Sequence, residues 1–375
     1  MNIAVNTRLL IKDKLEGIGW FSYQTLKRIT KQHPEHHFYF IFDRNFDNEF
    51  IFSSNVTPIV AGIPARHPIL WWLWFDVTIP KVLKKINADL FISTDGYLSL
   101  QTRIPQIAVI HDLNFAHHPE YLPAITSKYY NFFFPRFARK AIRLATVSEY
   151  SKNDIINTYG IQSDKIDVCY NGITEAFRPV SESEKQSIRA KYTQANDYFI
   201  FVGALNPRKN IVGLLKSFDA YCEAGGTHNL LIVGDAMHKT EEISQTVAHM
   251  RHTQKVIFAG RLNIEDLSKA MAAACAMVFV PFFEGFGIPL VEAMRCEIPI
   301  ICSNTTSLPE VAGDAALYAD PSDIEQIAKH MLNVSTNTNL RNQLIDAGRL
   351  QQQKFSWDLS ASRLWGCIEK AIHLS

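Results

Sequence analysis

The chain has 375 residues, of which 47% are hydrophobic and 20% are charged, a composition typical of a globular protein. This length exceeds what one ordinary hydrophobic core needs, so we expect two domains. The 38 basic and 37 acidic residues leave a formal net charge of +1. This nearly neutral balance lacks the strong positive charge that is typical of nucleic-acid-binding proteins, so we expect no nucleic-acid partner.

The six cysteines are scattered along apolar stretches and form no Cys-x-x-Cys pair. This pattern favours reduced, buried thiols in a reducing compartment, so we expect a cytoplasmic protein. The N-terminus begins directly as an apolar strand and lacks the basic and apolar regions of a secretory signal. No apolar run is long enough to cross a bilayer.

Short β-rich apolar runs alternate with helical patterns along the chain, which favours parallel, doubly wound sheets of an α/β fold. Two sheets of about five to seven strands fit this pattern better than a single large sheet. In the first half the expected strands are residues 3–6, 38–42, 56–60, 90–93, 106–110, 144–147 and 166–169. In the second half they are residues 198–202, 229–233, 256–259, 277–280 and 298–302.

A break between two domains is expected near residues 177–184, where proline, serine and charge replace the apolar alternation. We therefore expect a first domain over residues 1–178 and a second over residues 179–356. Residues 357–375 have the pattern of a final helix, capped by Ser356 or Asp358. Ligands of open α/β sheets bind beyond the carboxyl ends of the strands, so functional residues are sought in the loops that follow each strand.

Gly17 and Gly19 follow the first strand and resemble half of a dinucleotide fingerprint. The third glycine is missing, because Ser22 stands there, and no acidic residue follows at the expected distance, so an NAD site is excluded. An ordinary flexible turn is the other interpretation. Further along, residues 70–75 are densely aromatic. Buried packing is one explanation, and contact with a membrane interface is the other if the cluster is exposed.

His111 comes directly after the expected strand 106–110, where a histidine is usually a hydrogen-bonded cleft residue. Zinc binding is the alternative, because the chain has further histidines. Among these are His33, His36, His37, His117 and His118. They lack cysteine partners and a helical pair at i and i+4, so we predict no metal site.

The strand at 198–202 leads into a glycine turn at Gly203 and then into the adjacent cations Arg208 and Lys209. An arginine fork beside a compact lysine charge suits a diphosphate. Two solvated surface cations are the alternative, but their place after the first strand of the second domain favours a ligand. Gly260 and Arg261 also follow an expected strand.

Residues 281–292 hold the densest set of candidate groups. Gly285 and Gly287 lie between a strand and a helix that we expect to begin at Pro289, where the backbone turns sharply. Amide groups at a helix N-terminus bind anions, so this turn suits a phosphate.

Glu284 and Glu292 flank this turn, and we expect Glu292 in the first helical turn. Carboxylates accept hydrogen bonds from hydroxyls, often two at once. A nucleotide sugar, with phosphates between two hydroxyl-bearing rings, would satisfy all of these groups. Taken singly, Glu292 could instead complement the helix dipole, and Glu284 could be a solvated loop charge.

The two glutamates, separated by seven residues that include Gly285, Phe286 and Gly287, resemble the signature of retaining glycosyltransferases of group 1. These enzymes belong to glycosyltransferase family 4, and the chain looks most like its bacterial mannosyltransferases. The resemblance implies the GT-B architecture, two facing Rossmann-like domains with the active site in the cleft between them. It also implies that the helix at 357–375 packs back onto the first domain.

The resemblance assigns a role to each candidate residue. It implies that Arg208 and Lys209 hold the leaving diphosphate, that Glu284 binds the donor sugar with His111 close by, and that Glu292 binds the ribose. The other positions that it places at the donor are Gly17, Gly19, Gly203, Gly260, Arg261, Gly285, Phe286 and Gly287. Ala204 stands where many relatives carry another arginine, so one phosphate contact is expected to be missing or supplied differently.

The resemblance implies metal-independent transfer, with retention, of a hexose from a GDP- or UDP-linked donor to a hydroxyl of a glycan or lipid-linked saccharide. Mannose is the first expectation for the sugar, polysaccharide biosynthesis for the process, and no cofactor is required. Front-face attack is expected, with a covalent intermediate on Glu284 as the second mechanism. A sugar-nucleotide epimerase of the same fold and a non-catalytic binding module are the alternatives. If residues 70–75 are exposed, we expect peripheral attachment to the cytoplasmic face of a membrane.

Overall fold

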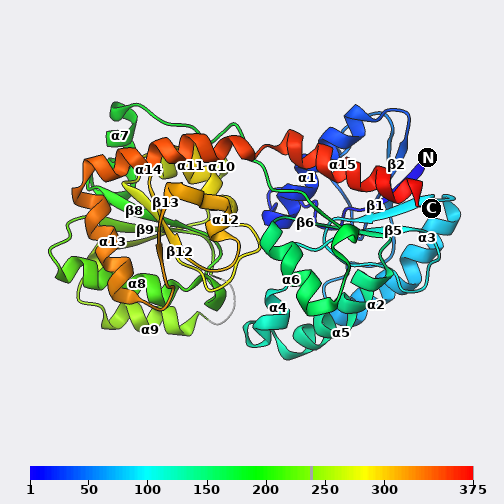
Figure 1. The fold of residues 1–375 in the computed structure, drawn as a ribbon, viewed down its shortest axis with the longest axis horizontal. Helices are drawn as coiled ribbons and strands as arrows, with labels where there is room; N and C mark the ends of the chain where they lie inside the picture. The colour runs from blue at the N-terminus through cyan, green and yellow to red at the C-terminus, as the bar shows by residue number, and fades with distance from the viewer. Residues whose placement is uncertain (237–239, 375) are drawn as a thin grey trace. The chain divides into compact units, whose positions relative to one another are not determined.

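The computed structural model describes residues 1–236 and 240–374 (Figure 1). The chain divides into two compact units, Met1–Gly172 together with Ser356–Ser375, and Ile173–Phe355. The last residue of the helix predicted at 357–375, Ser375, lies outside the described residues. Within those residues, no helix combines the length and the apolar character needed to cross a membrane.

Seven parallel strands form the sheet of the N-terminal unit, in the order β3-β2-β1-β4-β5-β6-β7. Their bounds are β1 (Asn2–Asn6), β2 (His37–Phe42), β3 (Val56–Val60), β4 (Leu90–Ser93), β5 (Gln106–Val109), β6 (Arg143–Thr146) and β7 (Ile166–Val168). All seven strands expected in this half are present. The strand order reverses between β1 and β4, so the topological switch point lies there.

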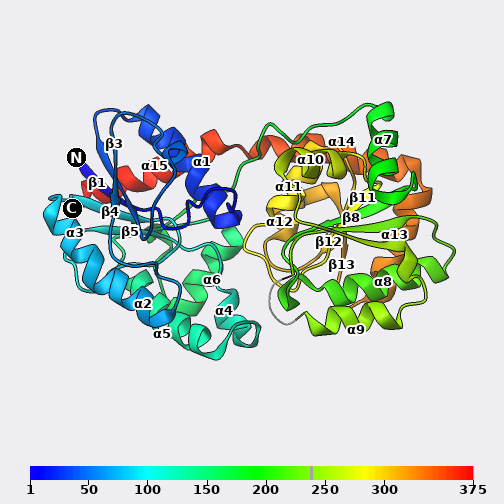
Figure 2. The same ribbon diagram turned by 180° about the vertical axis from the view of Figure 1, so that it is seen from behind.

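Right-handed crossovers place helices on both faces of this sheet (Figures 1 and 2). One face carries α1 (Gly17–Gln32) and α15 (Trp357–His373), and α15 packs on α1, β6 and β7. The other face carries α2 (Pro68–Leu73), α3 (Ile79–Lys85), α5 (Ala124–Lys140) and α6 (Glu149–Tyr159). A π-helical turn at Trp74–Thr78 joins α2 to α3, and a short α4 (Asn114–His117) precedes α5.

The C-terminal unit contains a six-stranded parallel sheet in the order β10-β9-β8-β11-β12-β13. Its strands are β8 (Tyr198–Val202), β9 (Asn229–Val233), β10 (Val256–Gly260), β11 (Ala276–Phe279), β12 (Ile300–Ser303) and β13 (Ala316–Ala319). The sequence did not predict β13, because a four-residue run that contains two alanines has little β-propensity. It lies at the edge of the sheet, where pairing with β12 alone places it.

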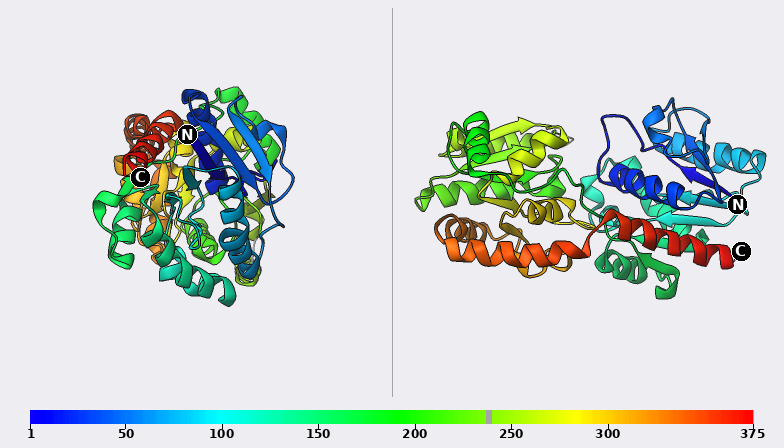
Figure 3. Two further views of the ribbon diagram at one scale, coloured as in Figure 1. Left: turned by 90° about the vertical axis from the view of Figure 1, so that its right-hand side faces the viewer. Right: turned by 90° about the horizontal axis from the view of Figure 1, so that it is seen from above.

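Helices also cover both faces of the second sheet (Figures 1 and 3). One face carries α8 (Ile211–Glu223), α9 (Glu241–His249) and α13 (Ile324–Thr336). The other carries α7 (Glu182–Thr193), α10 (Ile264–Ala272), α11 (Ile288–Arg295), α12 (Leu308–Ala312) and α14 (Thr338–Gln351). Because both faces are covered, β8, β9 and β11 are buried along their whole length and are continuous apolar runs in the sequence.

Candidate active site

The strand order of the C-terminal sheet reverses between β8 and β11, so the loops after these two strands lie side by side. The Phe282 N–H donates to the Arg208 carbonyl oxygen (2.9 Å), and Arg208 Nη1 donates to the Phe283 carbonyl oxygen (2.8 Å). The two most informative stretches of the sequence, at 201–210 and 281–292, therefore form one cluster in the fold.

Glu284 contacts both neighbouring cations through one oxygen. Its Oε1 lies 2.6 Å from Arg208 Nη1 and 2.5 Å from Lys209 Nζ. Lys209 and Glu284 are each only 8% exposed. Burial by itself would raise the pKa of Glu284, but the charges and hydrogen bonds of Arg208 and Lys209 outweigh burial and hold this pKa below its ordinary value. The three side chains, here called the Glu284 triad, keep one net positive charge and suit an anionic ligand.

Asn210 holds the loops of the Glu284 triad in place. Its backbone is left-handed, with φ of 55°, and its Oδ1 caps α8 by accepting from the Gly213 N–H (3.2 Å). Its Nδ2 donates to the carbonyl oxygens of Val280 (2.9 Å) and Pro321 (2.7 Å). Asn210 therefore ties together the loops after β8, β11 and β13. Asparagine tolerates this conformation and caps helices, so its type is a local signal, but its two distant partners could not be inferred from the sequence.

Gly287 makes the turn into α11 with φ of +91°, and a Cβ there would lie 2.7 Å from Leu308 Cδ2. Both the conformation and the space therefore require glycine. The helix begins at Ile288, so Pro289 occupies the second helical position and not the predicted first one. The Phe286 ring is buried and packs edge-on against Phe355 (5.5 Å), which leaves its backbone and not its ring as a candidate ligand contact.

The main chain of Glu284 is supported from the loop after β12. The Glu284 N–H donates to Thr306 Oγ1 (3.3 Å), and Ser307 Oγ donates to the Glu284 carbonyl oxygen (2.9 Å). Thr306 and Ser307 had not been singled out in the sequence, because their partner is distant along the chain. Their hydroxyls fix the backbone on which the carboxylate of the triad is carried.

Glu292 lies in the second turn of α11, because the first turn contains no acidic residue. We expected Glu292 in the first turn of a helix that begins at Pro289. The helix begins one residue earlier, at Ile288, and this places Glu292 just beyond the first turn. The side chain keeps part of its surface exposed. Desolvation by the surrounding protein nevertheless raises the pKa of Glu292 to about 8. The two glutamates of the motif therefore have pKa values shifted in opposite directions.

Of the predicted positions, Gly203 follows β8, Gly260 is the last residue of β10 and Arg261 follows β10, and the loop after β9 lies between these two places. A Cβ at Gly234, after β9, would lie 1.9 Å from the Gly203 carbonyl oxygen, so the loops after β8 and β9 touch. The Gly234 N–H in turn donates to the carbonyl oxygen of Gly260 (2.9 Å), the last residue of β10. Arg261 is exposed. In the part of the chain that the structure describes, no hydrogen bond or ion pair joins Arg261 to the Glu284 triad.

His111 stands at the carboxyl end of β5 in the N-terminal unit. Its Nε2 lies 2.9 Å from the Thr94 carbonyl oxygen, which can only accept, so Nε2 carries the proton and Nδ1 is left as an acceptor. Burial lowers the pKa of His111 and keeps the ring neutral at physiological pH. Ser22 Oγ also donates to Thr94 Oγ1 (2.7 Å), and Phe21 packs edge-on against the His111 ring (5.1 Å). The loop after β4 therefore joins His111 to α1.

Gly17 and Gly19 form the first turn of α1. This corrects the interpretation of the pair as an ordinary flexible turn, because both glycines are helical. A Cβ at Gly19 would lie 3.2 Å from the Leu9 carbonyl oxygen and from Leu15 Cδ2, so the helix start is pressed against the preceding loop.

At the switch point of the N-terminal sheet lies a buried ion pair that the sequence did not reveal. Arg8 Nε donates to Asp95 Oδ2 (2.6 Å), and Asn6 Nδ2 donates to Asp95 Oδ1 (2.7 Å). The Arg8 guanidinium also lies 4.3 Å from the centre of the Tyr97 ring. Arg8 was not singled out from the sequence, because a single arginine after a strand has no distinguishing pattern.

Residues 70–75 are partly buried in the core and partly exposed on the surface, so each of the two interpretations holds for some of them. Trp74 and Phe75 are fully buried, whereas Trp72 is 44% and Leu73 is 36% exposed. Trp71 is partly buried and donates from Nε1 to the Ala65 carbonyl oxygen (2.8 Å). The cluster is therefore core on one side and surface on the other.

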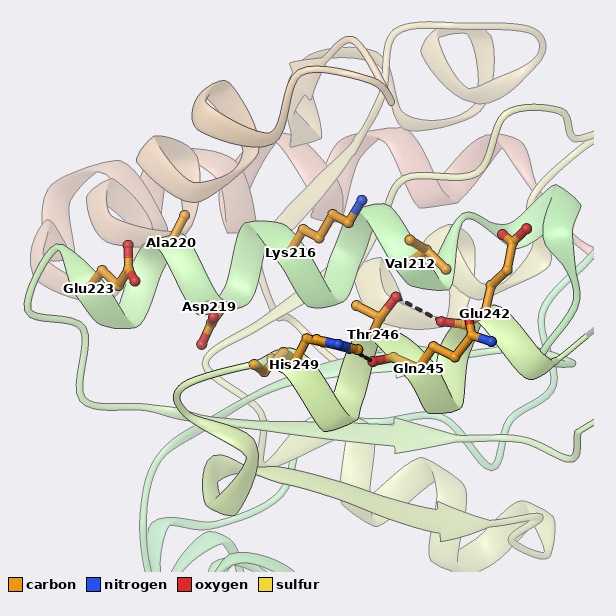
Figure 4. Close-up of a pocket in the computed structure, with 10 residues that line it drawn as sticks. Val212, Lys216, Asp219, Ala220, Glu223, Glu242, Gln245, Thr246 and His249 are labelled. Atoms are coloured by element: carbon orange, nitrogen blue, oxygen red, sulfur yellow. Dashed lines mark hydrogen bonds between the residues drawn. The ribbon is translucent and has the colours of Figure 1, made fainter.

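A groove of about 660 Å³ runs between α8 and α9 (Figure 4). Lys216, Asp219 and Glu223 line it from α8, and Glu242 and His249 line it from α9. None of the site residues predicted from the sequence lies along it. Within residues 1–236 and 240–374, no group of three or more histidine, cysteine, aspartate or glutamate side chains is arranged to hold a metal ion.

Comparisons with known families account for both units. Residues 16–177 match the family model described as Glycosyltransferase Family 4, and residues 183–351 match that of Glycosyl transferases group 1. Over 254 residues, 67% of each chain, the sequence is 32% identical to O-antigen chain mannosyltransferase B of Escherichia coli. The chain belongs to the group 1 glycosyltransferases of family 4. This glycosyltransferase is also 28% identical over 270 residues to O-antigen chain mannosyltransferase RfbU of Salmonella typhimurium, covering 72% of this chain and 71% of the relative.

Solved structures confirm the predicted GT-B fold. The glycosyltransferase matches sucrose-phosphate synthase from Thermosynechococcus elongatus with a TM-score of 0.80 at 15% identity, over 100% of both chains. It matches WaaG, a glycosyltransferase involved in lipopolysaccharide biosynthesis, with a TM-score of 0.75 at 16% identity, over 99% of both chains. An Anabaena protein solved in complex with UDP-glucose matches with a TM-score of 0.78 at 17% identity, over 99% of this chain and 100% of that chain.

Proposed function

We propose that the protein is a retaining, metal-independent mannosyltransferase that uses a nucleotide diphosphate sugar, GDP-linked in the first instance. The acceptor is a hydroxyl of a saccharide or of a lipid-linked saccharide in polysaccharide biosynthesis. The Glu284 triad supports this proposal best, because it places buried positive charge beside a carboxylate at the switch point of the second sheet. The similarity to two O-antigen mannosyltransferases supports mannose as the sugar.

In this proposal Arg208 and Lys209 bind the diphosphate together with the main-chain amides at 285–287. As the bond between the anomeric carbon and the phosphate oxygen breaks, negative charge grows on the leaving phosphate. Fixed cations in a buried setting lower that barrier without reorganising. The α11 N-terminus adds its dipole to the same charge. Because the protein supplies this positive charge, neither a divalent metal nor another cofactor is required.

Glu284 changes partners in this scheme. In the structure its carboxylate neutralises part of the charge on Arg208 and Lys209. When the phosphates bind these cations, the carboxylate oxygens become acceptors for the sugar hydroxyls. Glu292 accepts the ribose hydroxyls, and the loops at Gly203, Gly260 and Arg261 border the nucleotide base.

The N-terminal unit contributes the acceptor side. The unprotonated Nδ1 of His111 accepts a hydrogen bond from a hydroxyl of the donor sugar. The backbone at Gly17 and Gly19 approaches the donor phosphate. The acceptor hydroxyl attacks the anomeric carbon on the face that the phosphate leaves, and it gives its proton to the departing phosphate oxygen. No separate base is needed, and the configuration at the anomeric carbon is retained.

We place this reaction in the cytoplasm, with the protein attached peripherally to the cytoplasmic face of a membrane that carries the acceptor. The exposed side chains Trp72 and Leu73 within residues 70–75 support this attachment. A lipid-linked acceptor would be presented at such a surface.

A panel of nucleotide sugars tests the proposal, with thermal stabilisation as the first readout and product analysis by NMR as the second. We expect GDP-mannose to stabilise the protein most, transfer to proceed unchanged in EDTA, and the product to keep the α configuration of the donor. An inverted product, or activity that EDTA abolishes and a divalent ion restores, would contradict the mechanism. Isomerised nucleotide sugar formed from the donor alone would indicate an epimerase instead.

A further inference from the structure

Large apolar side chains are exposed mainly in one region of the N-terminal unit. Of the thirteen such residues identified in the described part of the chain, seven lie between the end of β3 and the end of α2, or on α5. These seven are Val60, Ile63, Ile69, Trp72, Leu73, Ile125 and Phe132. Scattered exposed apolar residues are normal, but a concentration in one region marks an interaction surface.

The apolar residues share one face on each helix. On α2, Ile69, Trp72 and Leu73 stand at positions i, i+3 and i+4 and are 60%, 44% and 36% exposed. On α5, Ile125 and Phe132 stand two helical turns apart and are 51% and 52% exposed.

The two helices lie side by side on the same face of the sheet (Figures 1 and 2). Trp71 of α2 joins them, stacking on Tyr130 with ring centroids 5.6 Å apart and meeting Tyr129 edge-on at 5.3 Å. The exposed apolar residues of α2 and α5 therefore belong to neighbouring helices that are packed through a common aromatic layer.

The same region, taken together with the adjoining helix α3, is strongly basic. Residues 58–86 contain four lysines and arginines and residues 124–140 contain four more, all of them exposed: Arg66, Lys81, Lys84, Lys85, Lys128, Arg136, Arg139 and Lys140. Asp76 is the one acidic residue in the two segments, and it is only 8% exposed. Since the whole chain has a net charge of +1, this excess is local.

Cations and apolar side chains share the outer face of α5. Lys128, Phe132 and Arg136 follow one another at intervals of four residues, so they form one stripe. The Arg136 guanidinium carbon lies 3.5 Å from the centre of the Phe132 ring. An apolar ring bordered by cations matches the boundary between acyl chains and anionic headgroups.

We infer that this α2–α5 surface, made of Ile69, Trp72, Leu73, Ile125, Lys128, Phe132 and Arg136, docks the protein on an anionic lipid membrane. Trp72 and Phe132 enter the headgroup region, and Lys128 and Arg136 contact the anionic headgroups. The inference rests on the proposed function in one respect, the lipid-linked acceptor, and it refines the attachment surface. The proposed surface leaves out Trp74 and Phe75, which are buried, and includes residues of α5. Its partner is anionic lipid.

Co-sedimentation with vesicles tests the surface. We expect the protein to bind vesicles of phosphatidylcholine with phosphatidylglycerol, to bind phosphatidylcholine alone weakly, and to be released by 0.5 M salt. The double variant Trp72→Ser, Phe132→Ser should lower the partition coefficient by roughly tenfold or more. The double variant Lys128→Gln, Arg136→Gln should lower binding by roughly tenfold and reduce its salt dependence.

Matched controls use exposed residues elsewhere. Leu350→Ser and Leu359→Ser remove apolar side chains that are 70% and 46% exposed, and both variants should sediment like the wild type. The pair Lys31→Gln, Lys329→Gln removes two other exposed cations and should also leave binding unchanged. Circular dichroism and thermal unfolding check that every variant is folded.

Three results would overturn the inference. The wild type could remain in the supernatant with anionic vesicles, or the two α2–α5 variants could bind as tightly as the controls. Sedimentation equilibrium could also show a wild-type dimer that the Trp72→Ser, Phe132→Ser variant abolishes, which would make the surface an interface between two copies. Stabilisation by GDP-mannose in free solution is measured on the same samples. If GDP-mannose fails to stabilise the protein while the protein still binds vesicles, the proposed donor is wrong but the proposed docking surface is retained.

Discussion

Lys209 Nζ and Glu284 Oε1 lie 2.5 Å apart, and the two side chains belong to loops that follow neighbouring strands, β8 and β11. Each residue is 8% exposed, so the pair is largely removed from water. Removing one member of a buried pair leaves the other charge desolvated and unpaired. Substitutions here are therefore expected to change stability as well as catalysis, and both must be measured.

Lys209→Ala removes one cation from the leaving-group site. If Lys209 contacts the departing phosphate, kcat should fall by about 10²–10³, as for the loss of one preorganised oxyanion donor. Steady-state kinetics with the donor identified in the panel measure this loss. Lys216→Ala, which removes an exposed cation two turns into α8, is the matched control and should keep wild-type turnover. Equal kcat values for the two variants would exclude Lys209 from the site.

Glu284→Gln should have opposite effects on product binding and on turnover. The amide cannot neutralise Arg208 and Lys209, so the free energy of unfolding should fall by about 3 kcal/mol in the absence of ligand. GDP should then bind more tightly than to the wild type, because its phosphates no longer compete with a carboxylate for the two cations. Transfer should fall, because the sugar loses its acceptor. Calorimetry with GDP that shows weaker binding to the variant would contradict this exchange of partners.

Glu292 is expected to make the protein less stable as the pH rises. Its pKa is about 8 in the folded protein against an ordinary value of 4.5, so the folded state holds the proton over that interval. Because the folded state binds more protons than the unfolded state, the free energy of unfolding falls from about pH 4.5 to pH 8. Allowing for its partial exposure, the effect is on the order of 2 kcal/mol. Urea unfolding of the wild type and of Glu292→Gln at pH 5, 7 and 9 measures this slope, which the variant should lack.

If Glu292 binds the ribose hydroxyls, donor affinity should rise with pH, whereas the free energy of unfolding falls. An ionised carboxylate accepts hydrogen bonds from both hydroxyls, whereas a protonated one has a single free acceptor oxygen. Donor affinity should therefore rise as the pH increases through about 8, the pKa of Glu292. The Glu292→Gln variant should bind more weakly and without this dependence. Identical affinity profiles for the two proteins would remove Glu292 from the donor site.

Gly287→Ala tests the turn that leads into α11. Its φ of +91° strains any residue with a Cβ, and the added atom would lie 2.7 Å from Leu308 Cδ2. We expect a loss of about 2–3 kcal/mol in unfolding free energy and weaker donor binding. Gly225→Ala is a matched control, because Gly225 has φ of +93° with nothing within 4 Å of the added Cβ. The difference between the two variants isolates the crowding, and equal losses would show that strain alone accounts for it.

Local patterns in the sequence predicted most of the strands. Residues 56–60, 90–93, 198–202 and 229–233 were located to the residue. For the last three the reason is that buried parallel strands are nearly continuous apolar runs between turn residues, whereas β3 at 56–60 is a partly buried edge strand. The edge strand β13 was missed, since Ala316–Ala319 depends on its pairing with β12. The start of α11 was also predicted one residue too late, at Pro289, because the helix begins at Ile288. That Gly17 and Gly19 belong to the first turn of α1 was not predicted.

By itself, the sequence determined the two-sheet α/β architecture, the family and the residue types available to the site. These follow from spacing along the chain, where alternation, glycine turns and the two glutamates are visible locally. Only the tertiary structure decided that Glu284 meets Arg208 and Lys209, and that Glu292 has a raised pKa while that of Glu284 is lowered. It alone also showed that Trp72 is exposed beside a buried Trp74. The physical reason is that burial and charge pairing depend on crossover connections, which bring together loops that are remote in sequence.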